Sequence, residues 1–168
     1  MKVSMTNGTL NYLAKLDKEH PEASLLFMQD EDKTLAYYEG DTSIFEEGRD
    51  YEIVDAVGEI QNSGFVVMNN IPVSHEGRPV FEDRFKNREG GVEKMDGFQA
   101  IRILRPLQGN TYVVLTQWRN EQSFENWKNS QSFEKAHKNS GPNHEKKPSF
   151  MDGQPYITQY SMVQFGEE

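Results

Sequence analysis

The sequence has 168 residues, no cysteine and a formal net charge of -9. A chain of this length can bury a core, and the lack of cysteine excludes disulfides, zinc–thiolate sites, iron–sulfur clusters and a thiol nucleophile. The net charge lies entirely in residues 1–60, with 14 acidic and 5 basic side chains against 13 of each in residues 61–168; because acidic surfaces repel phosphate backbones and anionic lipid, we expect neither nucleic acid nor a membrane as a partner.

The first third of the chain predicts one helix among four strands. The helix runs from Thr9 to about His20, where Pro21 stops it, and its apolar stripe consists of Leu10, Tyr12, Leu13 and Leu16. A polar turn at residues 29–33 separates two short apolar runs and predicts a hairpin. The predicted strands are Lys2–Met5, Ser24–Met28, Thr34–Tyr38 and residues 51–60, with an irregular link at Ser43–Arg49.

The rest of the chain repeats this plan. Pro79 stands in the first turn of a helix that ends before Gly90, and its apolar stripe consists of Val80, Phe81 and Phe85. Asn120 is a suitable N-cap for the next helix, and Ser130 for a short helix after it. Residues 138–148 are polar and contain glycine and proline, which favours a loop. The predicted strands are Phe65–Val73, Gly97–Arg105, Thr111–Trp118 and Tyr156–Phe165.

Two successive units of this kind predict an α+β protein built from ferredoxin-like units with antiparallel sheets. The polar stretch Gln61–Gly64 separates the units, which predicts an acidic N-terminal half-domain at residues 1–62 and a second domain at residues 63–168. The sequence has no unbroken apolar segment at its start and none of membrane-spanning length, so we expect a soluble, cytoplasmic protein. The fold class alone says nothing about function.

Trp127 and His137 stand ten residues apart on an apolar-periodic segment. Phe133 lies one turn before His137, and Phe124 lies one turn before Trp127, so each pair shares a helix face. On one unbroken helix the tryptophan and the histidine would point about 80° apart, at ~100° per residue, whereas a break near Ser130 lets both line one cavity. A flat ring beside a single imidazole suits a planar metal macrocycle. Ordinary packing of Trp127 in the core and of His137 at a helix end explains the same spacing.

The strand at residues 65–73 carries one asparagine on each face. Because side chains alternate along a strand, Asn69 shares a face with Phe65, Val67 and Ile71, and Asn70 lies on the other face. A buried asparagine without a partner costs roughly 1–3 kcal/mol, so Asn69 requires a ligand, a water or a neighbouring backbone group. A slip of one residue in the strand register would exchange the two faces.

Five segments occur together in an order that is typical of one family. They are NNIPV at 69–73, FEDRF at 81–85, GF at 97–98, VVLTQW at 113–118 and FENW at 124–127, with His137 ten residues beyond Trp127. This combination resembles the IsdG-type haem-degrading monooxygenases of the antibiotic-biosynthesis-monooxygenase (ABM) domain family. The resemblance covers residues 65–165. The acidic N-terminal part makes the sequence most similar to the longer bacterial HmoB-type enzymes.

The resemblance implies a haem site. His137 corresponds to the axial ligand of the haem iron, Trp127 to a ring that presses on the porphyrin, and Asn69 to a hydrogen-bond donor on the distal side. An imidazole nitrogen is a common haem ligand, a bulky indole can ruffle the macrocycle, and an amide can orient oxygen in a dry pocket. Phe85 and Arg88 match positions that line the haem cavity, with Arg88 placed to reach a propionate.

The implied activity is oxidative cleavage of haem, which is both substrate and cofactor, with release of iron and an open-chain tetrapyrrole. Because the sequence has neither a dinucleotide glycine fingerprint nor a cysteine cluster, the electrons must come from an external reductant, such as a separate reductase. Two alternatives stay open, a non-catalytic haem carrier or sensor and a cofactor-independent ABM-type quinol monooxygenase. Compact family members dimerise, so we expect residues 1–62 to replace the second subunit in a monomeric pseudo-dimer with one complete site.

Overall fold

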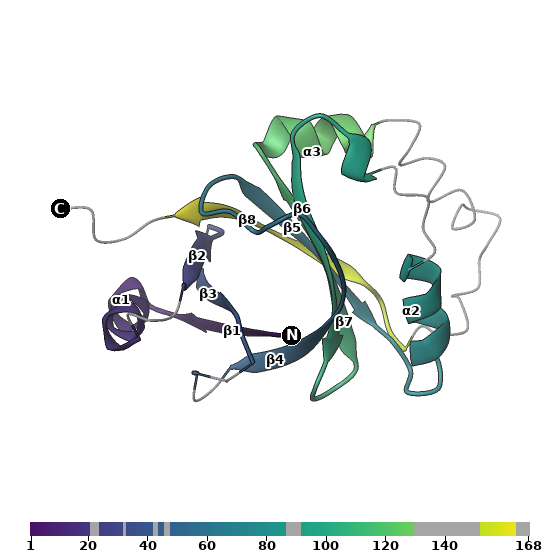
Figure 1. The fold of residues 1–168 in the computed structure, drawn as a ribbon, viewed down its shortest axis with the longest axis horizontal. Coiled ribbons are helices and arrows are strands. Elements are labelled where there is room, and N and C mark those ends of the chain that lie inside the picture. The colour runs from purple at the N-terminus through teal and green to yellow at the C-terminus, as the bar shows by residue number, and fades with distance from the viewer. Residues whose placement is uncertain are drawn as a thin grey trace.

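The computed structural model describes residues 1–20, 24–31, 33–41, 44–45, 48–86, 92–129 and 152–163. In these residues eight strands form one closed antiparallel barrel, and three α-helices lie outside it (Figure 1). The strands are β1 (Lys2–Gly8), β2 (Leu26–Gln29), β3 (Thr34–Glu39), β4 (Arg49–Val57), β5 (Phe65–Pro72), β6 (Phe98–Pro106), β7 (Thr111–Trp118) and β8 (Tyr156–Val163). The helices are α1 (Leu10–Glu19), α2 (Arg78–Lys86) and α3 (Glu121–Lys128), with a 3-10 turn η1 at Val92–Lys94. None of these helices is long and apolar enough to cross a bilayer.

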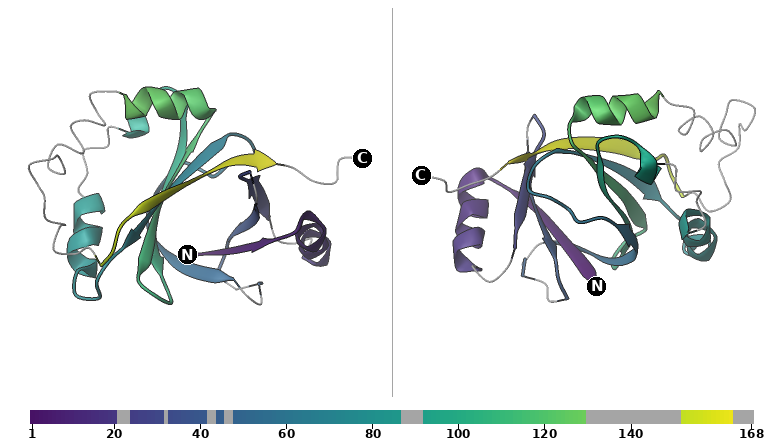
Figure 2. Two further views of the ribbon diagram at one scale, coloured as in Figure 1. Left: turned by 180° about the vertical axis from the view of Figure 1, so that it is seen from behind. Right: turned by 45° about the horizontal axis from the view of Figure 1, so that its top comes forward.

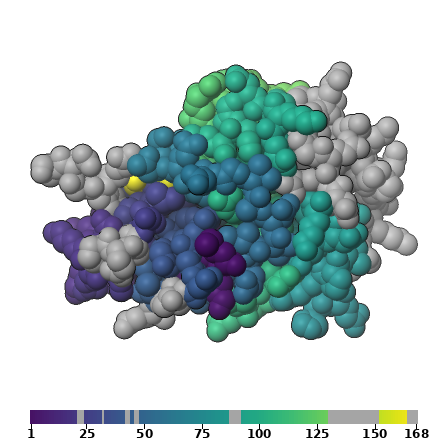
Figure 3. Space-filling view, viewed as in Figure 1, coloured from purple at the N-terminus to yellow at the C-terminus, as the bar shows by residue number. Residues whose placement is uncertain are grey.

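The two halves of the chain have the same strand order. Around the barrel the order is β1-β3-β2-β8-β5-β7-β6-β4, which gives β4-β1-β3-β2 for the first half and β8-β5-β7-β6 for the second. This confirms the predicted α+β class and the ferredoxin-like sheets. The sequence did not predict that the sheets close into one barrel, through pairing of β2 with β8 and of β4 with β6. Figures 2 and 3 show the two halves side by side.

Local signals determine where several elements begin and end. Thr9 caps α1 and Asn120 caps α3, each by accepting a hydrogen bond from a backbone N–H in the first turn. β4 ends at Val57, before the end of the expected strand at residues 51–60. The reason is Gly58, which has a φ of +75° and lies so close to β6 that a Cβ there would be 2.3 Å from the Gln99 carbonyl oxygen.

Side chains alternate between an inner and an outer core. The inner core fills the lumen of the barrel and includes Met5, Leu35, Tyr37, Met68, Leu104 and Leu115. The outer core lies between the second-half sheet and the helices α2 and α3, and includes Val67, Ile71, Phe81, Ile103, Trp118 and Phe124. A third cluster packs α1 against the first-half sheet and includes Leu13, Leu16, Phe27, Ala36 and Phe45. Full burial of such a side chain contributes about 1.5–3 kcal/mol, so these three clusters hold the fold together.

Three residues expected in apolar stripes lie at the surface instead. Leu10 is 48% exposed, Tyr12 42% and Val80 53%. The buried residues are Leu13 and Leu16 in α1 and Phe81 in α2. Each short helix thus contacts the barrel along one narrow row, and the neighbouring apolar positions face solvent.

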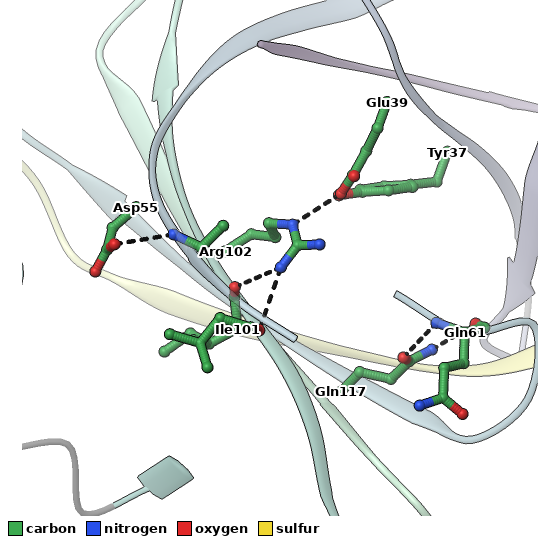
Figure 4. Close-up of polar contacts among 9 residues, drawn as sticks. Tyr37, Glu39, Asp55, Gln61, Ile101, Arg102 and Gln117 are labelled. Carbon is green, nitrogen blue, oxygen red and sulfur yellow. Dashed lines mark hydrogen bonds and ion pairs between the residues drawn. The ribbon is translucent and has the colours of Figure 1, made fainter. Parts of the chain in front are cut away.

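Polar side chains inside the barrel join the two halves at one end of the lumen (Figure 4). Arg102 of β6 donates through Nε to Glu39 of β3 at 2.8 Å, and the Tyr37 hydroxyl donates to the same carboxylate oxygen at 2.6 Å. The amide of buried Gln117 pairs with the backbone N–H and carbonyl of Gln61, at 2.7 Å each, and holds the segment between β4 and β5. These contacts close this end of the barrel.

The Arg102→Gln substitution is expected to lower the free energy of unfolding by about 2–4 kcal/mol, because it leaves a partly buried carboxylate without its cation. Urea denaturation at neutral pH measures this loss. Lys15→Gln is the control, since Lys15 and Glu19 form an exposed pair at 4.0 Å and such pairs contribute about 0–1 kcal/mol. Equal losses in the two variants would contradict a joining role for Arg102.

Candidate functional site

Asn69 lies in the middle of the outer face of the second-half sheet. On this face it stands opposite Val114 of β7 on one side and Ile157 of β8 on the other. Asn69 and Val114 are half-buried, and Ile157 is 57% exposed, so this part of the sheet is not fully covered. Within the described residues the Asn69 side chain makes no hydrogen bond. An amide in an apolar surround is therefore available to a ligand here.

Asn70 differs from Asn69 in both position and partners. It points into the lumen, where its amide donates to the Met68 carbonyl, the Tyr156 carbonyl and the Thr158 hydroxyl, each at 3.2 Å. The contacts to Tyr156 and Thr158 tie β5 to β8. Of the two neighbouring asparagines, Asn70 therefore has a structural role and Asn69 faces the helices.

Trp127 lies on α3 in a group of stacked aromatic rings at one end of the outer face. It is half-buried and stacks on Trp118, with ring centroids 5.7 Å apart and an angle of 29° between planes. Trp118 is fully buried, and its indole N–H donates to the Thr116 hydroxyl at 3.0 Å. Phe124 contacts both tryptophans, at 6.1 and 6.2 Å. Trp118 thus provides a rigid support that orients Trp127, a role that its position at the end of a strand did not reveal.

Phe85 belongs to α2, and Figure 2 shows α2 and α3 at opposite ends of this outer face. Phe85 is half-buried, and its ring is 4.8 Å from that of Phe81, which in turn packs edge-on against Tyr112 at 4.6 Å. Phe85, which the resemblance places in the lining of the haem cavity, is therefore anchored to β7 through Phe81 and Tyr112.

A charged cluster fixes α2 to the sheet. Glu82 accepts two hydrogen bonds from Arg105, both at 2.7 Å, and a further one from the Tyr112 hydroxyl. The Arg105 hydrogen bonds hold the pKa of the Glu82 carboxyl below its usual value of 4.5, and burial raises the pKa of the Tyr112 hydroxyl well above 10.0. The sequence showed these residue types, but not that they meet.

The Glu82→Gln substitution is expected to lower the free energy of unfolding by about 1–3 kcal/mol at pH 7, because it removes charge-assisted hydrogen bonds. The folded-state pKa is lowered, so the contribution of Glu82 is complete above the unfolded value near 4.5 and is lost as pH falls through the folded value. The stability difference between the two proteins should therefore shrink between pH 5 and pH 3. Urea denaturation across this range measures it, and a difference that does not change with pH would contradict the ionic role.

The two remaining predicted site residues, His137 and Arg88, lie outside the described residues. Their proposed roles therefore depend on the sequence resemblance. Two cavities of the structure lie away from Asn69 and Trp127, one beside the start of α1 and one at an end of the barrel. The candidate site is thus identified by the chemistry of the outer face, which carries aromatic and aliphatic groups together with the amides of Asn69 and of exposed Gln159, opposite Val67.

Comparison with known proteins finds a family similarity in the second half of the chain. Residues 64–139 match the family model described as "Antibiotic biosynthesis monooxygenase". The matched segment is thus similar to the domain that this model describes. The match spans the strands β5, β6 and β7 and the helices α2 and α3, which together present Asn69, Phe85 and Trp127.

Similar proteins match longer stretches of the chain than the family model does, and their names differ. A "Heme-degrading monooxygenase" of Listeria monocytogenes is 26% identical over 124 residues, which cover 73% of this chain and 74% of that protein. A "Signal transduction protein TRAP" of Staphylococcus epidermidis is 26% identical over 119 residues, covering 70% and 71%. The solved structure of a major regulator of staphylococcal pathogenesis superimposes with a TM-score of 0.83 at 20% identity and covers 96% of this chain and 98% of that one. At this identity the likeness shows the fold alone.

Proposed function

We propose that the protein is a haem-degrading monooxygenase of the IsdG type, which cleaves the porphyrin ring with O2 and releases iron and an open-chain tetrapyrrole. The observation that carries the proposal is the position of Asn69, a half-buried amide in a largely apolar and partly open sheet face between two helices that bear aromatic side chains. The Listeria relative named as a heme-degrading monooxygenase supports the choice of haem over other flat ligands.

Each residue has a distinct role in this proposal. Bound haem supplies the iron that activates O2. His137 holds the iron from one side, and Trp127, supported by Trp118, presses on the porphyrin and distorts it. Asn69 donates a hydrogen bond on the opposite side and orients the oxidant toward the ring. Phe85 lines the apolar pocket, and Arg88 pairs with a propionate.

The deciding experiment is a hemin titration followed by turnover. Hemin is added to the protein without oxygen, and a Soret band in the visible spectrum reports binding. Oxygen and a reductant, such as ascorbate or a reductase with NADPH, are then admitted. Loss of the Soret band with release of iron supports the proposal, and catalase in the same reaction excludes damage by free peroxide. A protein that forms no Soret complex would contradict it.

A non-catalytic haem carrier or sensor is the second candidate, because relatives named as signal transduction proteins match this chain at the same 26% identity. It predicts a Soret band that persists under turnover conditions. A cofactor-independent quinol monooxygenase, which the family description also allows, predicts oxygen consumption with a quinol and without haem.

We further propose that residues 1–62 replace the second subunit of a dimeric relative, so that the chain is a monomeric pseudo-dimer with one haem site in residues 63–168. The repeated strand order and the two junctions that close the barrel support this arrangement. Sedimentation should give a monomer, and hemin titration one equivalent per chain. A stable dimer or two equivalents would contradict it.

A further inference from the structure

The outer face of the second-half sheet is covered along β6 and β7 and open along β8. Ile103 of β6 and Trp118 of β7 are fully buried in the outer core. On β8, by contrast, the outward-facing residues Ile157, Gln159 and Ser161 are all exposed. Within the described part of the chain, the outer core contains no residue of β8. A flat ligand on this face therefore has access to β5 and β8 rather than to β6.

The strand register places Gln159 close to Asn69 on the same face. Gln159 stands opposite Val67 of β5, and Asn69 stands opposite Ile157 of β8, so the two amides are diagonal neighbours across the β5–β8 pair. Diagonal neighbours in an antiparallel pair lie roughly 7–8 Å apart, a distance that long side chains can span. Asn69 and Gln159 can therefore both reach one small molecule above the sheet.

Gln159 also lies level with the middle of the face, between Asn69 and the aromatic end. Trp118, which supports Trp127, stands opposite Phe65, four residues before Asn69 along β5. Gln159 stands opposite the position halfway between these two residues of β5. A broad planar ligand between Asn69 and Trp127 therefore has its open side along β8, next to Gln159.

The Gln159 side chain is available to a ligand. A glutamine amide carries two N–H donors and one carbonyl acceptor, on a side chain that is longer than that of asparagine. Among the residues that the structure describes, the Gln159 amide has no hydrogen-bond partner, whereas the amides of Gln99 and Gln117 are paired with Gln61. Water satisfies such an exposed amide in the free protein. A ligand that displaces this water must replace its hydrogen bonds.

We propose that Gln159 is a second hydrogen-bond donor, beside Asn69, to a diatomic molecule held between bound haem and the sheet. This inference rests on the proposed function, in which His137 holds the iron from the far side of the ring and the sheet lies on the Asn69 side. Two donors from neighbouring strands fix the direction in which such a molecule lies over the ring, whereas one amide leaves it free to turn. Gln159 is thus a residue that orients the molecule together with Asn69.

Carbon monoxide binding to the reduced, hemin-loaded protein tests this inference, because CO occupies the position of O2 and leaves the ring intact. Gln159→Leu keeps the size of the side chain and removes its amide. We expect CO to bind this variant about two- to tenfold more weakly than the wild-type complex, as the loss of one neutral hydrogen bond predicts. The C–O stretching band in the infrared should move to higher frequency, while the hemin affinity stays unchanged.

Gln108→Leu is the matched control. Gln108 is also an exposed glutamine, but it lies in the turn between β6 and β7. Its replacement should leave the CO affinity and the C–O band as in the wild-type complex. Both glutamines are exposed, so both variants should fold, and circular dichroism checks that they do.

The outcomes separate this inference from the haem proposal. Equal CO affinities and C–O bands in Gln159→Leu and Gln108→Leu would overturn the donor role of Gln159 while the haem proposal stands. A weaker CO affinity in Gln159→Leu, in a complex that does not cleave haem, would support the donor role and contradict haem cleavage. A wild-type protein that forms no Soret complex would overturn both.

Discussion

Hemin added to the His137→Ala variant is expected to bind at least about 100-fold more weakly than to the wild-type protein, a loss of about 2.7 kcal/mol. The reason is that His137 is the proposed single axial ligand, so its removal leaves only apolar contacts and propionate pairing to retain the haem. A hemin titration followed by absorbance measures the affinity. The Soret band of the wild-type complex should be absent or shifted in the variant, and haem cleavage should be lost with it.

The control for this experiment is His75→Ala. His75 is exposed in the turn before α2 and takes no part in the proposed site. Its replacement should leave the Soret band and the affinity unchanged. Addition of imidazole to His137→Ala should restore the Soret band of the wild-type complex, because free imidazole can take the place of the missing His137 side chain. An unchanged Soret spectrum and affinity in His137→Ala would refute the axial role and, with it, the proposed site.

The alternation of apolar and polar residues predicted most strands, and capping residues predicted where helices begin. The period-2 pattern predicted β5 and β7 within one residue of their ends, and Asn120 was identified as the cap of α3. Predicted strand ends were wrong where a contact with another strand determines the end. β4 ends before Gly58, for example, because β6 lies very close to this residue. Barrel closure could not be predicted, because pairing of β2 with β8 joins segments more than a hundred residues apart in the chain.

In the candidate site, too, the local sequence predicted which residues matter, and contacts between distant segments determine how they are placed. Alternation placed Asn69 and Asn70 on opposite faces, but only the structure shows that Asn69 faces α2 and α3 while Asn70 points into the lumen. The ten-residue spacing between Trp127 and His137 identified Trp127 as a candidate site residue. The support of Trp127 by Trp118 and the anchoring of α2 by Glu82 could not be predicted, because they depend on contacts between distant segments. The roles of His137 and Arg88 remain predictions from the resemblance.

Replacement of Asn69 and of Asn70 is expected to affect two different properties of the protein. Asn69→Ala is expected to bind hemin with nearly wild-type affinity but to cleave it about 100-fold more slowly, because one preorganised hydrogen bond to the oxidant is lost. Asn70→Ala should behave in the opposite way. It removes the hydrogen bonds from the Asn70 amide to Tyr156 and Thr158 of β8, so the free energy of unfolding falls by about 1–3 kcal/mol while the cleavage rate per folded molecule is kept.

Single-turnover loss of the Soret band and urea denaturation, measured on both variants, separate the two effects. Because the two residues are neighbours on one strand, each variant is the other's control for general damage to β5. Slow cleavage and full stability in Asn69→Ala, combined with the reverse in Asn70→Ala, would assign the chemistry to the outer face of the sheet. If Asn70→Ala instead lost cleavage at full stability, the reacting group would have to lie in the lumen. The haem would then occupy the lumen of the barrel rather than the face between α2 and α3.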